Sequence, residues 1–333
     1  MITRRRLIVG TVAAAVMAPA ISRAQKAAAA IRKVGVLVPY TETSVVGSDI
    51  ISLMRKELGR RGWTDGKNLQ LNARRKLADA TQIRVEAQAL VKWGADVILC
   101  ANAALLRATQ QETSTIPIVF VQVADPVGQG LVKTLVKPGG NATGIANYEF
   151  SMAEKWLQML KELVPNLTRA ALIYNVDSAL ANPAFVKAFE TAARSLKVTM
   201  STASSKTDAD IQGTVAALGG PPGGGFVVLS EPFSIAHRAQ IISMAARYKV
   251  PGVYPFRYFA AGGGLCSYGV NVQEAYQLGA DYIDRILKGE KPADMPIYRP
   301  NKFQLVVNLK TAKALKLTVP STIIGRADEI IQK

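Results

Sequence analysis

Hydrophobic and polar positions follow two alternating periods along most of the chain. Short apolar runs at residues 33–38, 96–100 and 118–123 are typical of buried strands. Between them, apolar residues recur at helical spacing, as they do over residues 50–58 and 80–93. Strands that alternate with helices in this way predict a parallel sheet with helices on both faces.

The same pattern starts again in the second half of the chain. Strands are predicted there at residues 169–174, 198–202, 225–229 and 252–254, with helices at 153–163, 184–196, 208–218 and 235–248. The later elements are a helix at 272–287, a strand at 303–308 and a helix at 311–315. They are too few for a third domain, so they must complete the two earlier sheets.

The fold class predicted is therefore α/β, with two doubly wound parallel-sheet lobes joined by a hinge that the chain crosses at least twice and, in the favoured arrangement, three times. The N-terminal lobe is predicted to contain residues 32–146 plus 267–295, and the C-terminal lobe residues 147–266 plus 296–333. Ligands of such sheets lie beyond the carboxyl ends of the strands. Two lobes that face one cleft can close on a ligand by hinge motion.

Residues 1–24 have the pattern of an export signal. Arg4, Arg5 and Arg6 precede an apolar run of 14 residues at positions 7–20, and small residues stand at positions 22 and 24. The run is short for a membrane-spanning helix, although an uncleaved anchor stays as an alternative. Removal of four arginines and no acid would lower the net charge from +17 to 17 − 4 = +13. We expect a soluble periplasmic protein.

The positive charge does not indicate a nucleic-acid partner. Lys and Arg total 41 against 24 Asp and Glu, but they are spread along the chain. Only residues 74–76 (RRK) form a cluster, and no aromatic residues are interleaved with it. A solvated basic surface is the interpretation we favour.

Enzymatic and metal-dependent functions find little support in the sequence. With one His and two Cys, a zinc site of about four such ligands is disfavoured, and no cofactor is predicted. The chain has no Gly-x-Ser-x-Gly nucleophile motif, and no Gly-x-Gly-x-x-Gly follows the first strand. Cys100 and Cys266 are interpreted as buried thiols, with a disulfide between them as the alternative.

Several segments carry a resemblance to a known family. They are residues 117–121 (PIVFV), 124–128 (ADPVG), 138–144 (PGGNATG), 267–271 (SYGVN), 286–294 (ILKGEKPAD) and 308–315 (NLKTAKAL). The sequence resembles the ABC-transporter substrate-binding proteins of the tryptophan-binding-like family over nearly all of residues 32–333. The resemblance implies the type I periplasmic-binding-protein fold and a solute receptor without catalytic residues.

Candidate ligand contacts follow from the positions at which strands end. In the first lobe these are Thr43, Ser44, Asn102, Ala103, Asp125 and Asn147. Hydroxyl groups and helix N-termini suit an anionic ligand group, and a carboxylate suits an ammonium. Helix capping is the alternative for Thr43, Ser44 and Asn102, and turn capping is the alternative for Asp125.

The second lobe offers a matching set: Tyr174, Asn175, Ser230, Glu231, Phe256 and Tyr268. Aromatic rings there could stack on a planar ligand, and packing within the lobe is the alternative for each ring. Glu231 together with Asp125 would make the cleft acidic and would favour a ligand that carries an amine.

The function we expect is that of the periplasmic solute-binding component of an ABC importer. Such a protein binds a small amino-acid-like or aromatic molecule between its lobes, as a monomer, and delivers it to a permease in the inner membrane. A sensory module that reports ligand occupancy to a membrane sensor is the alternative, and a periplasmic enzyme is the less favoured one.

Overall fold

The structure is a computed structural model that describes residues 31–39, 45–75, 80–147, 152–175, 183–220 and 222–332. The predicted export signal lies outside the described residues. So do two candidate ligand contacts, Thr43 and Ser44.

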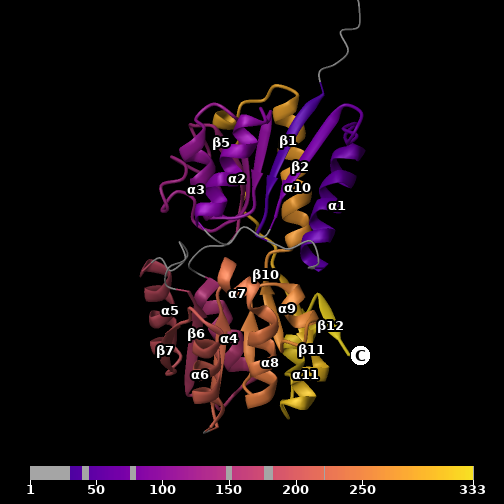
Figure 1. Ribbon diagram of the computed structural model, residues 1–333. Coiled ribbons are helices and arrows are strands. Elements are labelled where there is room, and N and C mark those ends of the chain that lie inside the picture. Colours follow the sequence, from indigo (N-terminus) through magenta and orange to yellow (C-terminus); the bar gives the residue numbers. More distant parts are fainter. Residues whose placement is uncertain are drawn as a thin grey trace, which may run out of the picture. The chain divides into compact units, whose positions relative to one another are not determined.

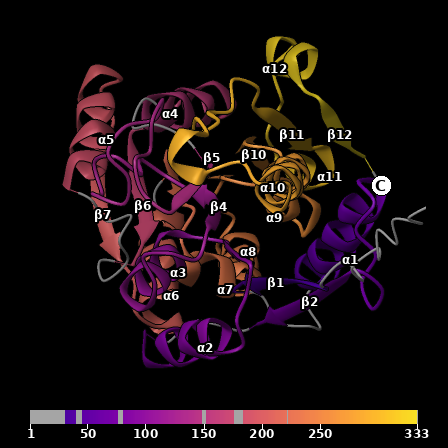
Figure 2. The same ribbon diagram turned by 90° about the horizontal axis from the view of Figure 1, so that it is seen from above.

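The first sheet has five strands in the order β2-β1-β3-β4-β5, and all of its neighbouring pairs are parallel. The strands are β1 (Arg32–Leu37), β2 (Leu69–Arg74), β3 (Val97–Cys100), β4 (Ile118–Val123) and β5 (Ala142–Ala146). Helices α1 (Val45–Arg60) and α10 (Val272–Leu287) cover one face, and α2 (Ala80–Lys92) and α3 (Ala103–Glu112) cover the other. Figures 1 and 2 show α10, in orange, among the purple elements of the first half of the chain.

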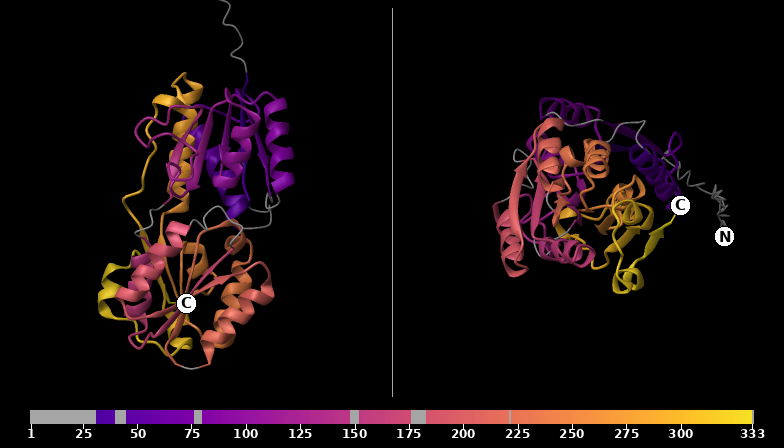
Figure 3. Two further views of the ribbon diagram at one scale, coloured as in Figure 1. Left: turned by 90° about the vertical axis from the view of Figure 1, so that its left-hand side faces the viewer. Right: turned by 90° about the horizontal axis from the view of Figure 1, so that it is seen from below.

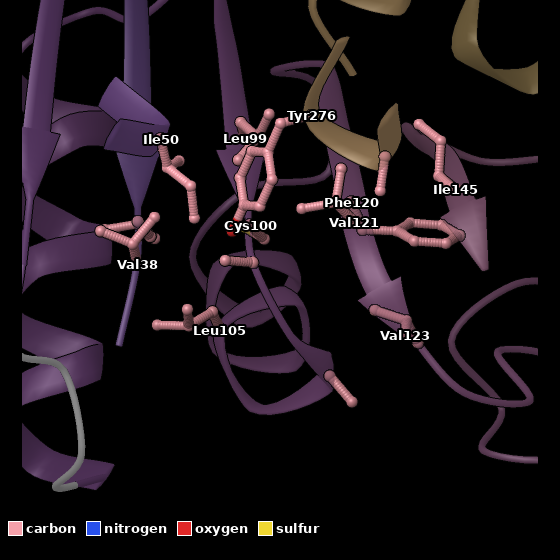
Figure 4. Close-up of a cluster of buried hydrophobic side chains, with 14 of the residues drawn as sticks. Val38, Ile50, Leu99, Cys100, Leu105, Phe120, Val121, Val123, Ile145 and Tyr276 are labelled. Atoms are coloured by element: carbon pink, nitrogen blue, oxygen red, sulfur yellow. The ribbon is translucent and has the colours of Figure 1, made fainter. Parts of the chain in front are cut away.

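The core of this lobe consists of apolar side chains that alternate between the two faces of the sheet. Ile98 faces α2, whereas Leu99 and Val121 face α10, where Gly279 allows the helix to approach the sheet closely. Figure 4 shows Leu99, Val121 and Tyr276 packed together. Because both faces are covered, these strands are almost wholly apolar.

The second sheet has seven strands in the order β12-β11-β10-β9-β8-β6-β7. The strands are β6 (Arg169–Tyr174), β7 (Thr199–Ser204), β8 (Gly224–Val228), β9 (Gly252–Tyr254), β10 (Cys266–Gly269), β11 (Gln304–Asn308) and β12 (Glu329–Ile331). All pairs are parallel except β10 with β11. The predicted fold class, two parallel-sheet α/β lobes, is confirmed.

Helices cover both faces of the second sheet as well. One face packs against α4 (Met152–Leu163) and α5 (Pro183–Ser195), and the other packs against α6 (Asp208–Gly219) and α8 (Arg238–Tyr248). The shorter elements are α7 (Pro232–Ala236), α9 (Arg257–Ala261), the 3-10 helix Pro292–Asp294, α11 (Leu309–Ala314) and α12 (Ser321–Arg326).

Strand pairing places two lobe boundaries later than the sequence predicts. Strand β10 pairs with β9 and β11, so Ser267 to Gly269 belong to the second sheet and not to the N-terminal lobe. After α10, the backbone N–H of Tyr298 donates to the carbonyl of Gly144 and the Tyr298 carbonyl accepts from Ala146. The first lobe therefore keeps the chain as far as Tyr298, and the chain passes three times from one sheet to the other.

Two local predictions differ from the structure. The helix predicted at residues 235–248 is divided at His237, which has φ −92° and ψ 13° and separates α7 from α8. Strand β5 was not predicted, because its sequence ATGIA lacks large apolar residues. A Cβ at Gly144 would lie 2.0 Å from the Phe120 carbonyl oxygen, so this small residue permits the pairing of β5 with β4.

Candidate ligand-binding site

Three amide-bearing residues share the carboxyl edge of the first sheet. Cys100 is in register with Phe120, and Asn102 and Gln122 each lie two residues further along neighbouring strands. Asn147 directly follows β5, and its backbone N–H donates to the Val123 carbonyl at 2.9 Å. Since neighbouring strands are about 4.8 Å apart, these residues lie close to one another.

Asn147 holds a buried amide that has no hydrogen-bond partner among the described residues. The residue is only 1% exposed, yet neither Oδ1 nor Nδ2 forms a hydrogen bond within the part of the chain that the structure describes. Buried polar groups in proteins are nearly always hydrogen-bonded, and an unbonded one costs about 1–3 kcal/mol. The amide therefore has one donor group and one acceptor that are not used within the described residues.

Asn102 combines a helix cap with a second unbonded group. Its Oδ1 accepts from the backbone N–H of Leu105 at 2.9 Å, which caps the N-terminus of α3 as the capping alternative predicts. Its Nδ2 is buried and has no hydrogen-bond partner among the described residues. The cap fixes the side chain and leaves the amide N–H groups available. The neighbouring candidate Ala103 is buried at the start of the helix.

Gln122 belongs to this edge, although its place inside β4 did not predict a ligand contact. It is 8% exposed, has a positive φ of 57°, and lies where the register between β4 and β5 shifts. The Tyr276 hydroxyl donates to its Oε1 at 3.4 Å, a long hydrogen bond. The available signal was a single polar residue inside the apolar run IVFVQV.

Asp125 lies at the same edge and caps its own turn. Its Oδ1 accepts from the backbone N–H of Gly128 at 2.9 Å, and its φ is 38°. This is the geometry that the turn-capping alternative predicts. A contact between Asp125 and a ligand ammonium stays a prediction.

At the carboxyl edge of the second sheet, Glu231 is buried and fully hydrogen-bonded. The carboxylate caps α7 by accepting from the backbone N–H groups of Phe233 at 2.9 Å and Ser234 at 2.8 Å, and from the Ser234 hydroxyl. The backbone N–H of Asn175 also donates to it. Burial raises the pKa of this carboxyl group, and the hydrogen bonds oppose that rise. These contacts give Glu231 a structural role, and its predicted role toward an amine is untested.

The other candidates of the second lobe are mostly buried. Tyr174 and Phe256 are 7% and 1% exposed and pack in the hydrophobic core, as the packing alternative predicts. Ser230 is buried between β8 and Glu231, and Asn175 is half-buried at the end of β6.

Tyr268 is the more accessible aromatic candidate. Its carbonyl accepts from the Trp156 indole N–H at 2.6 Å, and its half-buried ring lies 5.7 Å from the Phe303 ring.

The described candidates gather at the carboxyl edges of two sheets, six of them at the edge of the second and the remaining four at the edge of the first.

The described residues hold no group of three or more His, Cys, Asp or Glu side chains that could bind a metal ion. Cys100 and Cys266 are both free and buried, and they lie in different sheets, so the disulfide alternative is wrong. None of the helices described is long and apolar enough to cross a membrane.

Comparison with known proteins identifies the family. Residues 33–331 match the family of ABC transporter substrate binding proteins. The chain belongs to this family. Its members bind substrates for transport and are not enzymes, in agreement with the sequence prediction.

Three related proteins illustrate the similarity. A tyrosine-binding protein of Clostridioides difficile (strain R20291) is 24% identical over 283 residues, which cover 82% of this chain and 79% of that protein. A Streptococcus pneumoniae ABC domain in complex with L-Trp has a TM-score of 0.81 at 23% identity, covering 90% of this chain and 99% of that chain. A conserved domain protein from Vibrio cholerae has a TM-score of 0.82 at 25% identity, with the same coverage.

Proposed function

We propose that this substrate-binding protein serves an ABC importer and binds an amino-acid-like or aromatic molecule between the carboxyl edges of its two sheets. The observation that supports the site is the buried amide of Asn147, whose Oδ1 and Nδ2 both lack partners in the described structure. The ligand class is supported by the two relatives described as tyrosine-binding and as an L-Trp complex.

The polar groups at the first sheet suit the main-chain end of an amino acid. The Nδ2 groups of Asn102 and Asn147 donate to a carboxylate, and Oδ1 of Asn147 accepts from an ammonium. Partly exposed aromatic rings such as Tyr268 offer an apolar surface for the side chain of the ligand. No step of this function needs a cofactor or a catalytic residue.

A thermal-shift screen tests the proposal. The protein from residue 25 onward would be heated with tyrosine, tryptophan, other amino acids, nucleosides, sugars and polyamines. A ligand at a hundredfold excess over its Kd stabilises the folded state by about 2.7 kcal/mol, which raises the midpoint. We expect aromatic amino acids to raise it without being consumed.

Two variants make the screen specific for the site. Asn147→Ala should abolish the ligand-induced shift of the midpoint. The control Asn301→Ala changes an exposed residue between Tyr298 and the start of β11, and it should keep the shift. A shift that survives Asn147→Ala would refute the site. Consumption of the compound would revive the enzyme interpretation.

We also propose that the chain is exported to the periplasm and delivers its ligand to an inner-membrane permease. Residues 1–24 support the export, and membership of the family supports the permease. Cell fractionation of the full chain, compared with a variant in which Arg4, Arg5 and Arg6 are replaced by Gln, tests the location. Retention of the wild-type chain in the cytoplasm would contradict it.

A further inference from the structure

Seven of the described helices end in the same hydrogen-bonded turn, in which an N–H donates to the carbonyl five residues earlier. The bonds of the first lobe run from Trp63 to Leu58, from Ala95 to Leu90 and from Glu290 to Arg285. Those of the second lobe run from Val198 to Ala193, from Val250 to Ala245, from Leu317 to Ala312 and from Gly264 to Phe259. The residue before each donor has a positive φ.

The two lobes mostly fill this position with different residues. In the first lobe it is Gly62, Gly94 and Gly289, with φ of 93°, 75° and 107°. In the second lobe it is lysine in three helices, Lys197, Lys249 and Lys316, with φ of 54°, 54° and 56°, and glycine in the fourth, Gly263, with φ of 112°. Glycine adopts this left-handed conformation freely, whereas a residue with a Cβ does not.

The helix dipole does not explain the difference. A cation at a helix C-terminus is favourable, but the helices of the first lobe have the same dipole and use glycine. Helix α9 of the second lobe ends with Gly263, where a Cβ would approach Ile242 to 3.3 Å, so a side chain has little room there. The second lobe therefore keeps lysine at three strained positions where glycine would relieve the strain.

All three lysines lie at the amino edge of the second sheet or beside it. Lys197 comes two residues before β7, and Lys249 comes three residues before β9. Helix α11 starts at the same edge, because the Asn308 N–H donates to the Leu265 carbonyl just before β10. Its six residues extend about 9 Å, so the lysines that it carries stay near this edge. Figure 3 shows this end of the protein in its right-hand view, from below.

Two more lysines belong to this surface. Lys310 and Lys313 precede Lys316 at intervals of three residues, and all three are exposed. We call these two together with Lys197, Lys249 and Lys316 the basic edge. Within the described part of the chain, none of the five forms an ion pair.

Acidic residues of the second lobe are concentrated at the opposite edge. Glu154, Asp208 and Asp210 lie in the first turns of α4 and α6, and Glu231 caps α7. Near the amino edge, Glu162 is engaged by Arg326. The acidic residues thus lie mainly away from the basic edge, although Lys155 and Lys206 accompany them at the opposite edge.

We propose that the basic edge binds the surface of a membrane that contains anionic lipids. Its lysines span the sheet from β11 to β7, five strand spacings or about 24 Å, which suits an extended surface of negative charge. Lysine is a hydrated point charge on a flexible stem and fits diffuse headgroup phosphates, each lysine adding to the attraction. The predicted export favours a membrane over nucleic acid as the anionic partner. Binding would concentrate the receptor at the membrane.

Vesicle cosedimentation tests this proposal with residues 31–333, which contain both complete sheets but not the apolar signal. Phosphatidylcholine vesicles with and without phosphatidylglycerol would be compared at low and high salt. We expect binding only to the anionic vesicles, and we expect high salt to reverse it. The variant Lys197→Gly, Lys249→Gly, Lys316→Gly should bind about a hundredfold more weakly.

Glycine keeps the left-handed turns, so a loss of binding in this variant cannot be attributed to unfolding; its circular dichroism and melting would verify this. The control Lys56→Gln, Lys67→Gln, Lys92→Gln removes the same charge from exposed positions of the first lobe and should bind like the wild type. The proposal fails if the wild type ignores anionic vesicles, if the glycine variant binds as well as the wild type, or if the control loses as much affinity. Preferred binding to a DNA duplex over the vesicles would also overturn it.

Discussion

At the scale of single residues, the candidate site contains polar groups that the described fold leaves unbonded. Asn147 is 1% exposed, like the residues of the core, and yet its amide completes no hydrogen bond within the described chain. Such a residue lowers the stability of the empty protein. Its retention is understandable if a ligand completes the hydrogen bonds.

We therefore expect Asn147→Leu to stabilise the ligand-free protein while it abolishes binding. Leucine has a similar shape and removes the unbonded amide, so the free energy of unfolding should rise by about 1–2 kcal/mol. Urea denaturation without ligand measures this change. Asn141→Leu is the matched control and should be destabilising, because Asn141 donates to the carbonyls of Thr113 at 3.1 Å and Ile116 at 2.8 Å. A destabilised Asn147→Leu variant would show that the amide is already bonded.

Glu231 should give stability a measurable pH dependence. Burial raises the pKa of its carboxyl group in the folded protein above the value of about 4.3 that it has when unfolded. Between these two pKa values the folded state holds more protons, so the free energy of unfolding falls as the pH rises through this window and is then constant. Glu231→Gln should remove this component.

Chemical denaturation of the wild type and of Glu231→Gln, repeated at intervals of about one pH unit from about pH 4 to neutrality, would measure this component of the stability. The wild type should lose stability relative to Glu231→Gln as the pH rises. The opposite trend would mean that the hydrogen bonds from Phe233, Ser234 and Asn175 outweigh burial.

Part of the candidate site can be predicted from the sequence at this scale. Asn102 and Asn147 could be identified because a residue that follows a parallel strand lies at the ligand edge. Gln122 could not, because its inward position depends on a local change of register in β4 that no periodicity encodes. Whether Asp125 and Glu231 act as caps also depends on φ and on the next helix, which the sequence leaves open.

At the scale of elements, the ends of the helices carry the clearest prediction about stability. Gly62→Lys should destabilise the protein by about 1 kcal/mol, because a side chain would be forced into the left-handed region at φ 93°. No atom lies within 4 Å of a Cβ at Gly62, so crowding adds nothing to this cost. Conversely, Lys249→Gly should stabilise by as much as about 1 kcal/mol, less the lost attraction to the helix dipole.

Thermal melting checks these two predictions: the midpoint should fall in Gly62→Lys and rise in Lys249→Gly. Gly59→Ala, within α1 and also without neighbours near its Cβ, is the control for a change of glycine at an ordinary helical φ and should be stabilising. If Gly62→Lys and Gly59→Ala changed the melting midpoint equally, the left-handed backbone at Gly62 would not be the cause of the destabilisation.

Elements with strong periodicity were predicted well, and elements defined by long-range pairing were not. The helix predicted at residues 272–287 has the same bounds as α10, whereas β5 is a strand only because β4 is beside it. The assignment of β10 to the second sheet depends on β9 and β11, which lie before and after it in the sequence. A boundary between lobes is a property of the pairing, so local patterns placed it too early.

At the scale of the whole molecule, the chain joins its two sheets three times, and α10 from the last quarter of the sequence completes the first lobe. The general plan of two lobes could be predicted from the repeated alternation of strands and helices. Neither lobe consists of a single continuous segment of the chain. This interleaving argues against lobes that unfold independently.

Each sheet contains one cysteine, so the reactivity of the two thiols can show whether the two lobes unfold together. Cys100 lies in β3 and Cys266 in β10, and both are fully buried. Burial raises the pKa of the Cys100 thiol to about 12, although a hydrogen bond with Thr109 opposes it, and burial also raises the pKa of the Cys266 thiol. Both thiols should therefore be inert in the native protein and react only when their sheet opens.

We predict that the two thiols become reactive at the same urea concentration, measured separately in Cys266→Ala and Cys100→Ala with a thiol reagent, after correction for the stability of each variant. An aromatic amino acid that binds both carboxyl edges should move both midpoints upward together, because a ligand stabilises every part that must be folded to bind it. Protection of Cys100 alone would mean that the ligand contacts only the first sheet. Different midpoints without ligand would show that the lobes unfold separately in spite of the three connections.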